Sequence, residues 1–248
     1  MGHTSCMAEK TPLMYGELAS WFHLLTPPAD YEEEAAEVLA LLDAYADAPP
    51  ETALELGSGG GNLASHLGGR LTLSLTDQSA EMLQQSRSIN PAAEHLEGDM
   101  RTLRLGRTFD AVIIHDAIVY MRTEGDLQAA MQTAWAHLRP GGAAILTPDW
   151  VRDDYSPKTE HGGSDLDTRG LRYLEWDRPI EPDGHTVKTD IVIVTRVDDD
   201  VTIHHDVHSL GLFPRATWLR LLGDIGFEAH RIVGQEGLDI FIGVRPAH

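Results

Sequence analysis

A glycine-rich turn is the first feature of this sequence that indicates chemistry. Four glycines fall within five positions, at Gly57 and Gly59–Gly61, directly after the apolar run of residues 52–56. Glycine inside a regular element costs roughly 0.5–1 kcal/mol relative to alanine, so such a cluster needs a reason. Backbone N–H groups between a strand and a helix can lie directly against a polar ligand. The turn therefore predicts a binding site that the backbone approaches closely.

Two familiar ligand classes can be tested on this turn. A P-loop requires Lys and Ser or Thr after the last glycine, whereas Asn62 follows here, so that class is excluded. A dinucleotide fingerprint can be aligned with Gly59, Gly61 and Ala64, with Asp77 accepting from a ribose hydroxyl at the tip of the next strand. That match rests on few residues, and other parts of the chain must decide it.

Reactive side chains also follow the strand-like run at residues 109–115. His115 and Asp116 end this run, and Tyr120 lies five residues after His115. Open α/β sheets bind ligands beyond the carboxyl ends of their strands, so all three are candidates for the site. The alternatives are that the His115 ring packs while its backbone contacts the ligand, that Asp116 caps the loop, and that Tyr120 belongs to the core.

A histidine-rich strand is the third candidate. On a strand, His204, Asp206 and His208 share one face, whereas His205 points the other way. Two imidazoles and a carboxylate are a donor set for a divalent ion. The same residues equally suit the polar floor of a pocket or a solvated surface, and we expect no metal.

The elements that position these residues alternate between strands and helices up to residue 149. Helices are expected at 30–45, 80–88 and 126–138, with a further one beginning near 62, and strands at 52–56, 71–76, 93–99, 109–115 and 143–149. This alternation predicts an α/β fold with a mainly parallel sheet. Residues 150–186 are polar and turn-rich, and two long antiparallel strands follow around a turn at 198–200. A helix at 213–226 and a hairpin at 227–244 end the chain.

We therefore expect three regions. Residues 1–149 hold N-terminal helices and a Rossmann-like core, residues 150–212 form an antiparallel insertion on the substrate side, and residues 213–248 complete the core with a helix and a hairpin. In a chain of 248 residues this corresponds to one large domain with an insertion.

The amino-acid composition limits which molecules the protein can bind. The formal net charge of −20 repels phosphate backbones and anionic membrane surfaces, so we expect neither nucleic acid nor membrane as a partner. The acidity either keeps the protein in solution or favours a cationic substrate such as an amine. The N-terminus lacks the apolar centre of a signal peptide, no run is long enough to span a bilayer, and the single Cys6 cannot form an internal disulfide. We expect a cytoplasmic protein, with a homodimer open as its assembly.

Five stretches in register resemble the motifs of class I S-adenosylmethionine-dependent methyltransferases. They are LELGSGGGN at 54–62, LTDQSAEML at 75–83, EGDMR at 97–101, FDAVIIHDAIVYM at 109–121 and HLRPGGAAIL at 137–146. The resemblance implies a seven-stranded Rossmann-like fold that binds S-adenosylmethionine. By this resemblance Glu55 lies near the amino group of the cofactor, Asp77 takes both ribose hydroxyls, and Asp99 accepts from the adenine amine.

The same resemblance implies a set of further cofactor contacts. Gly57, Gly59 and Gly61 pass along the methionine and ribose, Gln78 and Met82 pack by the ribose and adenine, and Met100 offers a backbone N–H. The remaining expected contacts are Tyr15, Tyr31, Ser58, Asn62 and His115.

Within this family, the chain looks similar to small-molecule methyltransferases of bacterial secondary metabolism. The segments MYGELASWF, DYEEEAA and FIGVRP and the HHDVH strand resemble N,N-dimethyltransferases of nucleotide-linked amino sugars, although the first part of the insertion is longer here and the loop after residue 115 is shorter. The resemblance implies methyl transfer to an amine nitrogen. It places His115 and Asp116 beside the reactive sulfonium and the histidine strand with His204 and His208 at the substrate. Tyr120, and Tyr173 of LRYLEW, are further candidates for the substrate pocket, although strand alternation alone equally explains the pattern around Tyr173.

Other functions remain open from the sequence alone. Oxygen or carbon is the alternative methyl acceptor. A nicotinamide-dependent oxidoreductase would use the same glycines, but Glu55 and the GDM stretch at 98–100 argue against it. A non-catalytic cofactor-binding protein would not need the polar tip at His115 or the long insertion.

Overall fold

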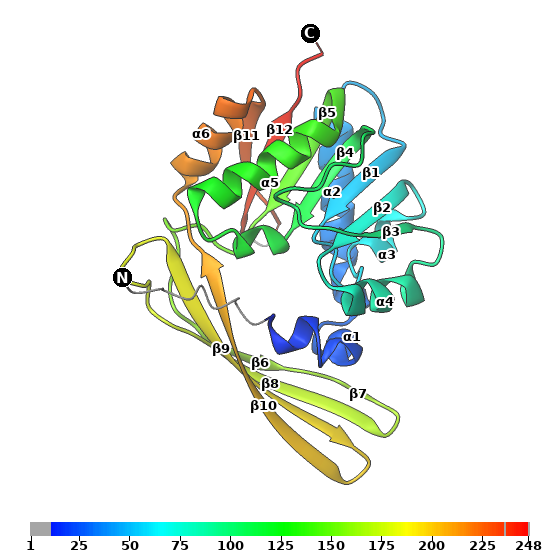
Figure 1. Ribbon diagram of the computed structural model, residues 1–248, viewed down its shortest axis with the longest axis vertical. Coiled ribbons are helices and arrows are strands. Elements are labelled where there is room, and N and C mark those ends of the chain that lie inside the picture. The colour runs from blue at the N-terminus through cyan, green and yellow to red at the C-terminus, as the bar shows by residue number, and fades with distance from the viewer. Residues whose placement is uncertain (1–10, 236, 248) are drawn as a thin grey trace, which may run out of the picture.

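The chain folds around two β-sheets, which we call the main sheet and the insertion sheet. A computed structural model describes residues 11–235 and 237–247, so Cys6 lies outside the described residues. In Figure 1 the insertion sheet extends below the body that contains the main sheet. No helix within the described residues is long and apolar enough to cross a membrane.

The main sheet has seven strands in the order β11-β12-β5-β4-β1-β2-β3. Its strands are β1 (Thr52–Leu56), β2 (Thr72–Asp77), β3 (Glu94–Glu97), β4 (Phe109–His115), β5 (Leu138–Thr147), β11 (Glu228–Val233) and β12 (Asp239–Val244). The first five are parallel, and the terminal hairpin adds β12 antiparallel to β5. The expected seven-stranded fold is confirmed. The carboxyl ends of β1, β2, β4 and β5 therefore meet at one edge.

Helices cover both faces of the main sheet (Figure 1). They are α1 (Phe22–Leu25), α2 (Glu32–Tyr45), α3 (Ala64–Leu67), α4 (Ala80–Ile89), α5 (Glu124–His137) and α6 (Arg215–Ile225), with 3₁₀ turns η1 (Leu13–Tyr15), η2 (Ala19–Trp21), η3 (Pro28–Tyr31) and η4 (Ala117–Tyr120). Apolar side chains of α5 and α6 form one buried cluster with the sheet, and those of α2 and α3 form another on the opposite face. The helix expected after the glycines is only one turn long.

The insertion sheet contains more strands than the sequence predicts. It runs in the order β10-β9-β8-β6, with β7 paired to β8. The strands are β6 (Thr159–Gly162), β7 (Asp165–Leu166), β8 (Arg169–Asp177), β9 (Thr186–Val197) and β10 (Asp200–Gly211). The expected hairpin around residues 198–200 is present, with Asp198 at a positive φ of 51°. The expected antiparallel insertion is present, and three of its strands form within the segment expected to be turn-rich, at 159–177.

The N-terminal turns connect the two sheets. Met14, Leu18 and Leu24 are buried against Leu171 and Ile193 of the insertion sheet. Ser79 at the start of α4 donates from its hydroxyl to the carbonyl of Tyr15 at 2.6 Å. The N-terminal segment thereby closes one side of the space between the sheets.

Candidate functional site

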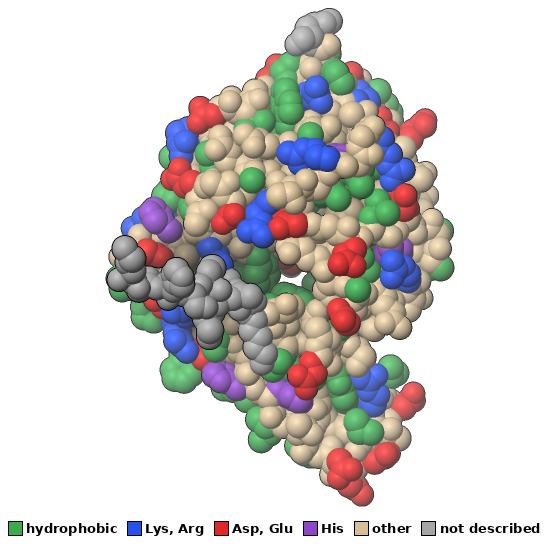
Figure 2. Space-filling view, in the orientation of Figure 1, with side chains coloured by type: hydrophobic (Ala, Val, Ile, Leu, Met, Phe, Trp, Pro, Cys, Tyr) green, Lys and Arg blue, Asp and Glu red, His purple; other side chains and the backbone are tan. Residues whose placement is uncertain are grey.

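A large cavity lies between the carboxyl edge of the main sheet and the inner face of the insertion sheet. Its volume is about 1230 Å³, and Figure 2 shows the surface hollowed between these two parts. Single-ligand pockets usually occupy about 300–1,000 Å³, so the cavity has room for two ligands side by side. The loops after β1, β2, β4 and β5 form one wall, and β8, β9 and β10 form the other.

Four buried polar atoms face this cavity without a partner in the described protein. They are Glu55 Oε2, Ser58 Oγ, Asn62 Oδ1 and Thr147 Oγ1. Buried polar groups normally have partners, so orphans gathered in one cavity indicate a polar ligand there. Glu55 is only 2% exposed, and burial raises its pKa from 4.5 to about 8 despite the nearby His115. A carboxylate in this position matches a ligand that carries an ammonium group.

Asp77, at the end of β2, holds the glycine-rich turn in place. Its Oδ2 accepts the Gly59 N–H at 2.9 Å and its Oδ1 accepts the Ser79 N–H at 2.8 Å. Burial raises its pKa, and the N–H donors oppose that effect. Each carboxylate oxygen can accept more than one hydrogen bond, so Asp77 can still accept from a ligand in the cavity that it lines.

The three glycines expected at the cofactor have different reasons to be glycine. All three have positive φ, at 74° for Gly57, 52° for Gly59 and 78° for Gly61. A Cβ on Gly57 would meet Ala117 at 2.5 Å, and one on Gly61 would meet Ser86 and Asn90 of the protein itself. Only Gly59 has no atom within 3.4 Å of such a Cβ and lines the cavity. Gly61 does not line the cavity, so packing against α4 and Asn90 already accounts for this glycine.

The remaining expected cofactor residues divide into two groups. Tyr15, Tyr31, Gln78, Met100 and His115 line the cavity. Two others do not: Met82 is fully buried beneath the turn, and the Asp99 carboxylate binds the Arg101 guanidinium at 2.6 Å. Arg101 lines the cavity in place of Asp99. The adenine contact expected of Asp99 would therefore compete with this ion pair.

His115, at the end of β4, is held between two acids. Its Nε2 lies 2.6 Å from Glu34 of α2, and its Nδ1 lies 3.2 Å from Asp116. Burial alone lowers the pKa of His115, but Asp116 and the hydrogen bond to Glu34 outweigh it and raise the pKa to about 9. The imidazole is therefore cationic at neutral pH. It stabilises negative charge rather than accepting a proton.

Asp116 and Asp149 form a pair of acids beside His115. Asp116 has a positive φ of 46°, and its carboxyl is hydrogen bonded to that of Asp149. Burial and the charge of Asp116 raise the pKa of Asp149 well above its ordinary value. One proton shared between two carboxyls avoids two adjacent buried charges.

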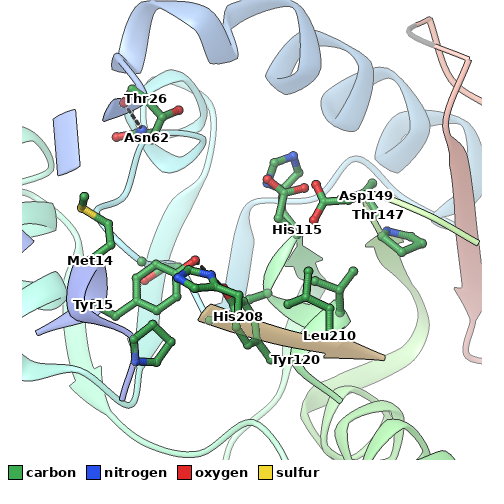
Figure 3. A pocket seen from close by; sticks show the side chains of 18 of the residues that line it. Met14, Tyr15, Thr26, Asn62, His115, Tyr120, Thr147, Asp149, His208 and Leu210 are labelled. Atoms are coloured by element: carbon green, nitrogen blue, oxygen red, sulfur yellow. Dashed lines mark hydrogen bonds and ion pairs between the residues drawn. The ribbon is translucent and has the colours of Figure 1, made fainter. Parts of the chain in front are cut away.

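A network of hydrogen-bonded side chains joins the N-terminal segment and the loop after β4 to β10 across the cavity (Figure 3). The hydroxyls of Tyr15 and Tyr120 are 2.8 Å apart, and the Tyr120 hydroxyl is 2.7 Å from His208 Nδ1. His208 Nε2 lies 3.3 Å from Asp206 on the same face of β10. The structure thus brings together Tyr15 of η1, Tyr120 of η4 and His208, which the sequence could only place separately.

Two residues expected at the substrate do not line the cavity. Tyr173 packs in the cluster beneath the N-terminal turns, and His204 lies farther along β10, where its Nε2 is 3.4 Å from Thr195 Oγ1. A substrate contact for either residue therefore stays a prediction without support from the cavity lining. Among the described residues no group of three or more His, Cys, Asp or Glu side chains is arranged to hold a metal ion.

Sequence reasoning also missed two residues of the site. Glu34 was attributed only to the acidic first turn of a helix, and Asp149 only to the end of a strand. Asp149 follows β5 at the same sheet edge as His115, a position that could have identified it. Glu34 is 81 positions from His115, and no sequence signal joins the two.

Comparisons with known proteins agree with this geometry. Residues 53–142 match the family model described as a methyltransferase domain. The dTDP-3-amino-3,6-dideoxy-alpha-D-glucopyranose N,N-dimethyltransferase of Streptomyces fradiae is 27% identical over 252 residues, covering 98% of this chain and 97% of the relative. The dTDP-3-amino-3,4,6-trideoxy-alpha-D-glucopyranose N,N-dimethyltransferase of Streptomyces venezuelae is 28% identical over 228 residues, covering 87% and 91%.

A solved structure extends the likeness to the whole fold. The crystal structure of Streptomyces venezuelae DesVI superimposes with a TM-score of 0.81 at 24% identity, covering 93% of this chain and 98% of that one. The similarity therefore includes the insertion sheet as well as the main sheet.

Proposed function

We propose that this S-adenosylmethionine-dependent methyltransferase methylates the amine nitrogen of a nucleotide-linked amino sugar. The full-length match to two N,N-dimethyltransferases of dTDP-amino sugars carries this proposal, because it includes the insertion that forms the acceptor wall. At 27% and 28% identity, those relatives support the acceptor class for this chain.

The residues at the carboxyl edge fit the methyl donor. Glu55, buried and with one oxygen unpartnered, would bind the ammonium, and Ser58 and Asn62 offer their unpartnered atoms nearby. Asp77 would accept from the ribose hydroxyls. When bound, S-adenosylmethionine supplies a methyl group that is already activated on a sulfonium. The chain itself therefore has to align the acceptor and exclude water.

We further propose that His115 and Asp116 position charge and do not act as a general base. With a pKa near 9, His115 is already protonated at neutral pH. Its contacts with Glu34 and Asp116 fix the end of β4 beside the cavity. The acceptor would instead lie where Tyr120 of η4 and His208 of β10 meet and line the cavity.

A second candidate acceptor is an amine that carries no nucleotide. Among the described residues, ten acidic side chains line the cavity: Glu34, Glu37, Glu55, Asp77, Glu81, Asp116, Asp149, Glu160, Glu175 and Asp239. Two arginines and one lysine, Arg101, Arg122 and Lys158, line it as well, beside the cationic imidazole of His115. Arg101 is paired with Asp99, and Lys158 with Glu160. This balance favours a cationic amine over a diphosphate.

An acceptor comparison tests the proposal and separates the two candidates. Purified protein is incubated with S-adenosylmethionine and either dTDP-3-amino-3,6-dideoxyglucose or the same amino sugar without its nucleotide. S-adenosylhomocysteine and the mass of the acceptor are measured. We expect the nucleotide-linked sugar to gain methyl groups with the higher kcat/KM. Preference for the free amino sugar would support the second candidate, and methylation of neither would overturn both.

A further inference from the structure

The hydrogen bonds that link Tyr15, Tyr120, His208 and Asp206 have a definite direction from donor to acceptor. Asp206 receives the Leu13 N–H, and although burial opposes ionisation, its bonds to His208 and to this N–H lower its pKa. A charged Asp206 can only accept, so His208 Nε2 must carry the proton between them. His208 Nδ1 is then a lone pair that accepts from the Tyr120 hydroxyl.

The direction of these bonds also determines which tyrosine hydroxyl donates and which accepts. Because Tyr120 donates to His208, its oxygen must accept from the Tyr15 hydroxyl, 2.8 Å away. The Tyr15 oxygen then keeps its lone pairs for the cavity that it lines. Burial raises the pKa values of both tyrosines, so both stay neutral hydroxyls. These hydrogen bonds thus present the Tyr15 oxygen to the cavity as a proton acceptor and end at the buried imidazole of His208, which is 6% exposed.

We propose that Tyr15, Tyr120, His208 and Asp206 form a proton relay that deprotonates a bound acceptor ammonium. This inference rests on the proposed function as an amine methyltransferase. The ammonium N–H bond breaks and its proton moves to Tyr15, Tyr15 passes its own proton to Tyr120, and Tyr120 passes its proton to His208 Nδ1. The electron pair stays on the nitrogen, which becomes the nucleophile. Asp206 stabilises the imidazolium, and His208 later returns the proton to solvent.

The charged groups around the relay bear on whether His208 can take up a proton. Besides Asp206 on its own strand, His208 interacts with Glu175 on β8. Asp149, beyond β5, interacts with both tyrosines, and Asp116 and Asp77 interact with Tyr15. The charge of Asp206 and the single negative charge shared by Asp116 and Asp149 favour a positive charge on the relay. In this scheme Tyr15 touches the acceptor, whereas His208 and Asp206 act through it.

A pH profile separates this role from a structural one. His208→Asn places an amide oxygen near the Nδ1 position, which keeps the hydrogen bond from Tyr120 but cannot take its proton. The variant must bind an acceptor that is already neutral, so its defect should grow about tenfold for each pH unit below the acceptor's pKa. With dTDP-3-amino-3,6-dideoxyglucose we expect the kcat/KM of His208→Asn to be about 100-fold below the wild-type value at pH 6.5. At pH 9.5 the two values should agree within about threefold.

Matched variants complete the kinetic test. Tyr120→Phe should show the same pH-dependent defect, whereas His205→Asn, on the exposed face of the same strand, should match the wild type at every pH. A loss of kcat/KM that is constant across pH would overturn the relay, and so would an equal loss in His205→Asn.

The direction of the chain can be measured without turnover. Nitrogen-15 NMR of the histidine rings in the ligand-free protein should show His208 as the neutral tautomer with the proton on Nε2, and Tyr120→Phe should shift its Nδ1 resonance. A proton on Nδ1 would overturn the proposal. If no amino sugar is methylated, the proposed function fails. The NMR measurement still decides whether the Tyr120 hydroxyl donates to His208.

Discussion

Replacing Glu55 by Gln should weaken binding of S-adenosylmethionine and remove its dependence on pH below about 8. Gln keeps the shape of the side chain and removes its charge. In the ligand-free protein the pKa of Glu55 is about 8, so only about 1% of the carboxyl is ionised at pH 6. Binding an ammonium requires the ionised form, and the wild-type affinity should therefore rise about tenfold per pH unit from pH 6 to 8.

The magnitude at pH 8 follows from the lost charge-assisted contact. A hydrogen bond to a charged group contributes about 1.5–3 kcal/mol, so Glu55→Gln should weaken binding roughly 10- to 150-fold there. Isothermal titration calorimetry at pH 6, 7 and 8 measures both effects. The ligand's own α-amino group titrates near the same pH, about 8, so the two proteins are compared at each pH.

The same substitution should stabilise the empty protein. The folded pKa of Glu55 is raised, so the folded state holds the proton more tightly than the unfolded chain, and stability is lost as the pH rises from 4.5 to about 8. The full cost is about 5 kcal/mol above pH 8, at about 1.4 kcal/mol per pKa unit. Glu55→Gln should therefore raise the ligand-free Tm at pH 8.5.

Glu97→Gln is the control, because it removes one charge from an exposed position on β3. Unchanged affinity and unchanged pH dependence in Glu55→Gln would refute the placement of the cofactor's ammonium at this carboxylate.

Three further substitutions test other parts of the site. Asp77→Ala should weaken S-adenosylmethionine binding about 10- to 100-fold by calorimetry, since it removes charged hydrogen bonds contributing about 1.5–3 kcal/mol, and unchanged affinity in a folded variant would refute the ribose assignment. Gly61→Ala should lower the ligand-free Tm, because its Cβ meets Ser86 at a φ of +78°, with a cost of about 1–3 kcal/mol. Gly59→Ala has only the cost of its φ of +52°, since no atom lies within 3.4 Å of its Cβ, so it should lower the Tm less than Gly61→Ala while weakening binding. The reverse pattern would contradict the division between the two glycines. His115→Gln should cost up to about 3 kcal/mol of stability below pH 6.5, because the folded pKa is about 9, and this difference should vanish as the pH rises through 9 in denaturant titrations.

The centre of the main sheet was predictable because β1, β4 and β5 are buried on both faces. Residues 109–115 form an apolar, β-branched run, and β4 lies where that run is. The glycine turn and Asp77 were predictable for a related reason, since a positive φ and a strand-end carboxylate leave local marks in the sequence. The glycine pattern could not show which glycine faces ligand and which faces α4, because that depends on packing.

The sequence left the role of β8 open because the pattern of this strand is inverted. Leu174 and Trp176 point outward and are 42% and 62% exposed, while Glu175 lines the cavity on the inner face. A half-buried strand is expected to have its apolar residues on the buried face. This strand has them on the exposed face, so its pattern does not indicate which face is buried. The relay was equally hidden, because Tyr15, Tyr120 and His208 come from three distant segments whose contacts only the fold creates.

The most direct test of the account is the chemical identity of the transferred methyl group. The protein is incubated with S-adenosylmethionine carrying a carbon-13 methyl and with dTDP-3-amino-3,6-dideoxyglucose, and the product is examined by carbon–proton correlation NMR. We predict a labelled methyl signal coupled to the ring carbon that bears the amine, which identifies N-methylation. A label on a sugar oxygen or carbon, or a labelled methyl that stays on the donor, would contradict the account.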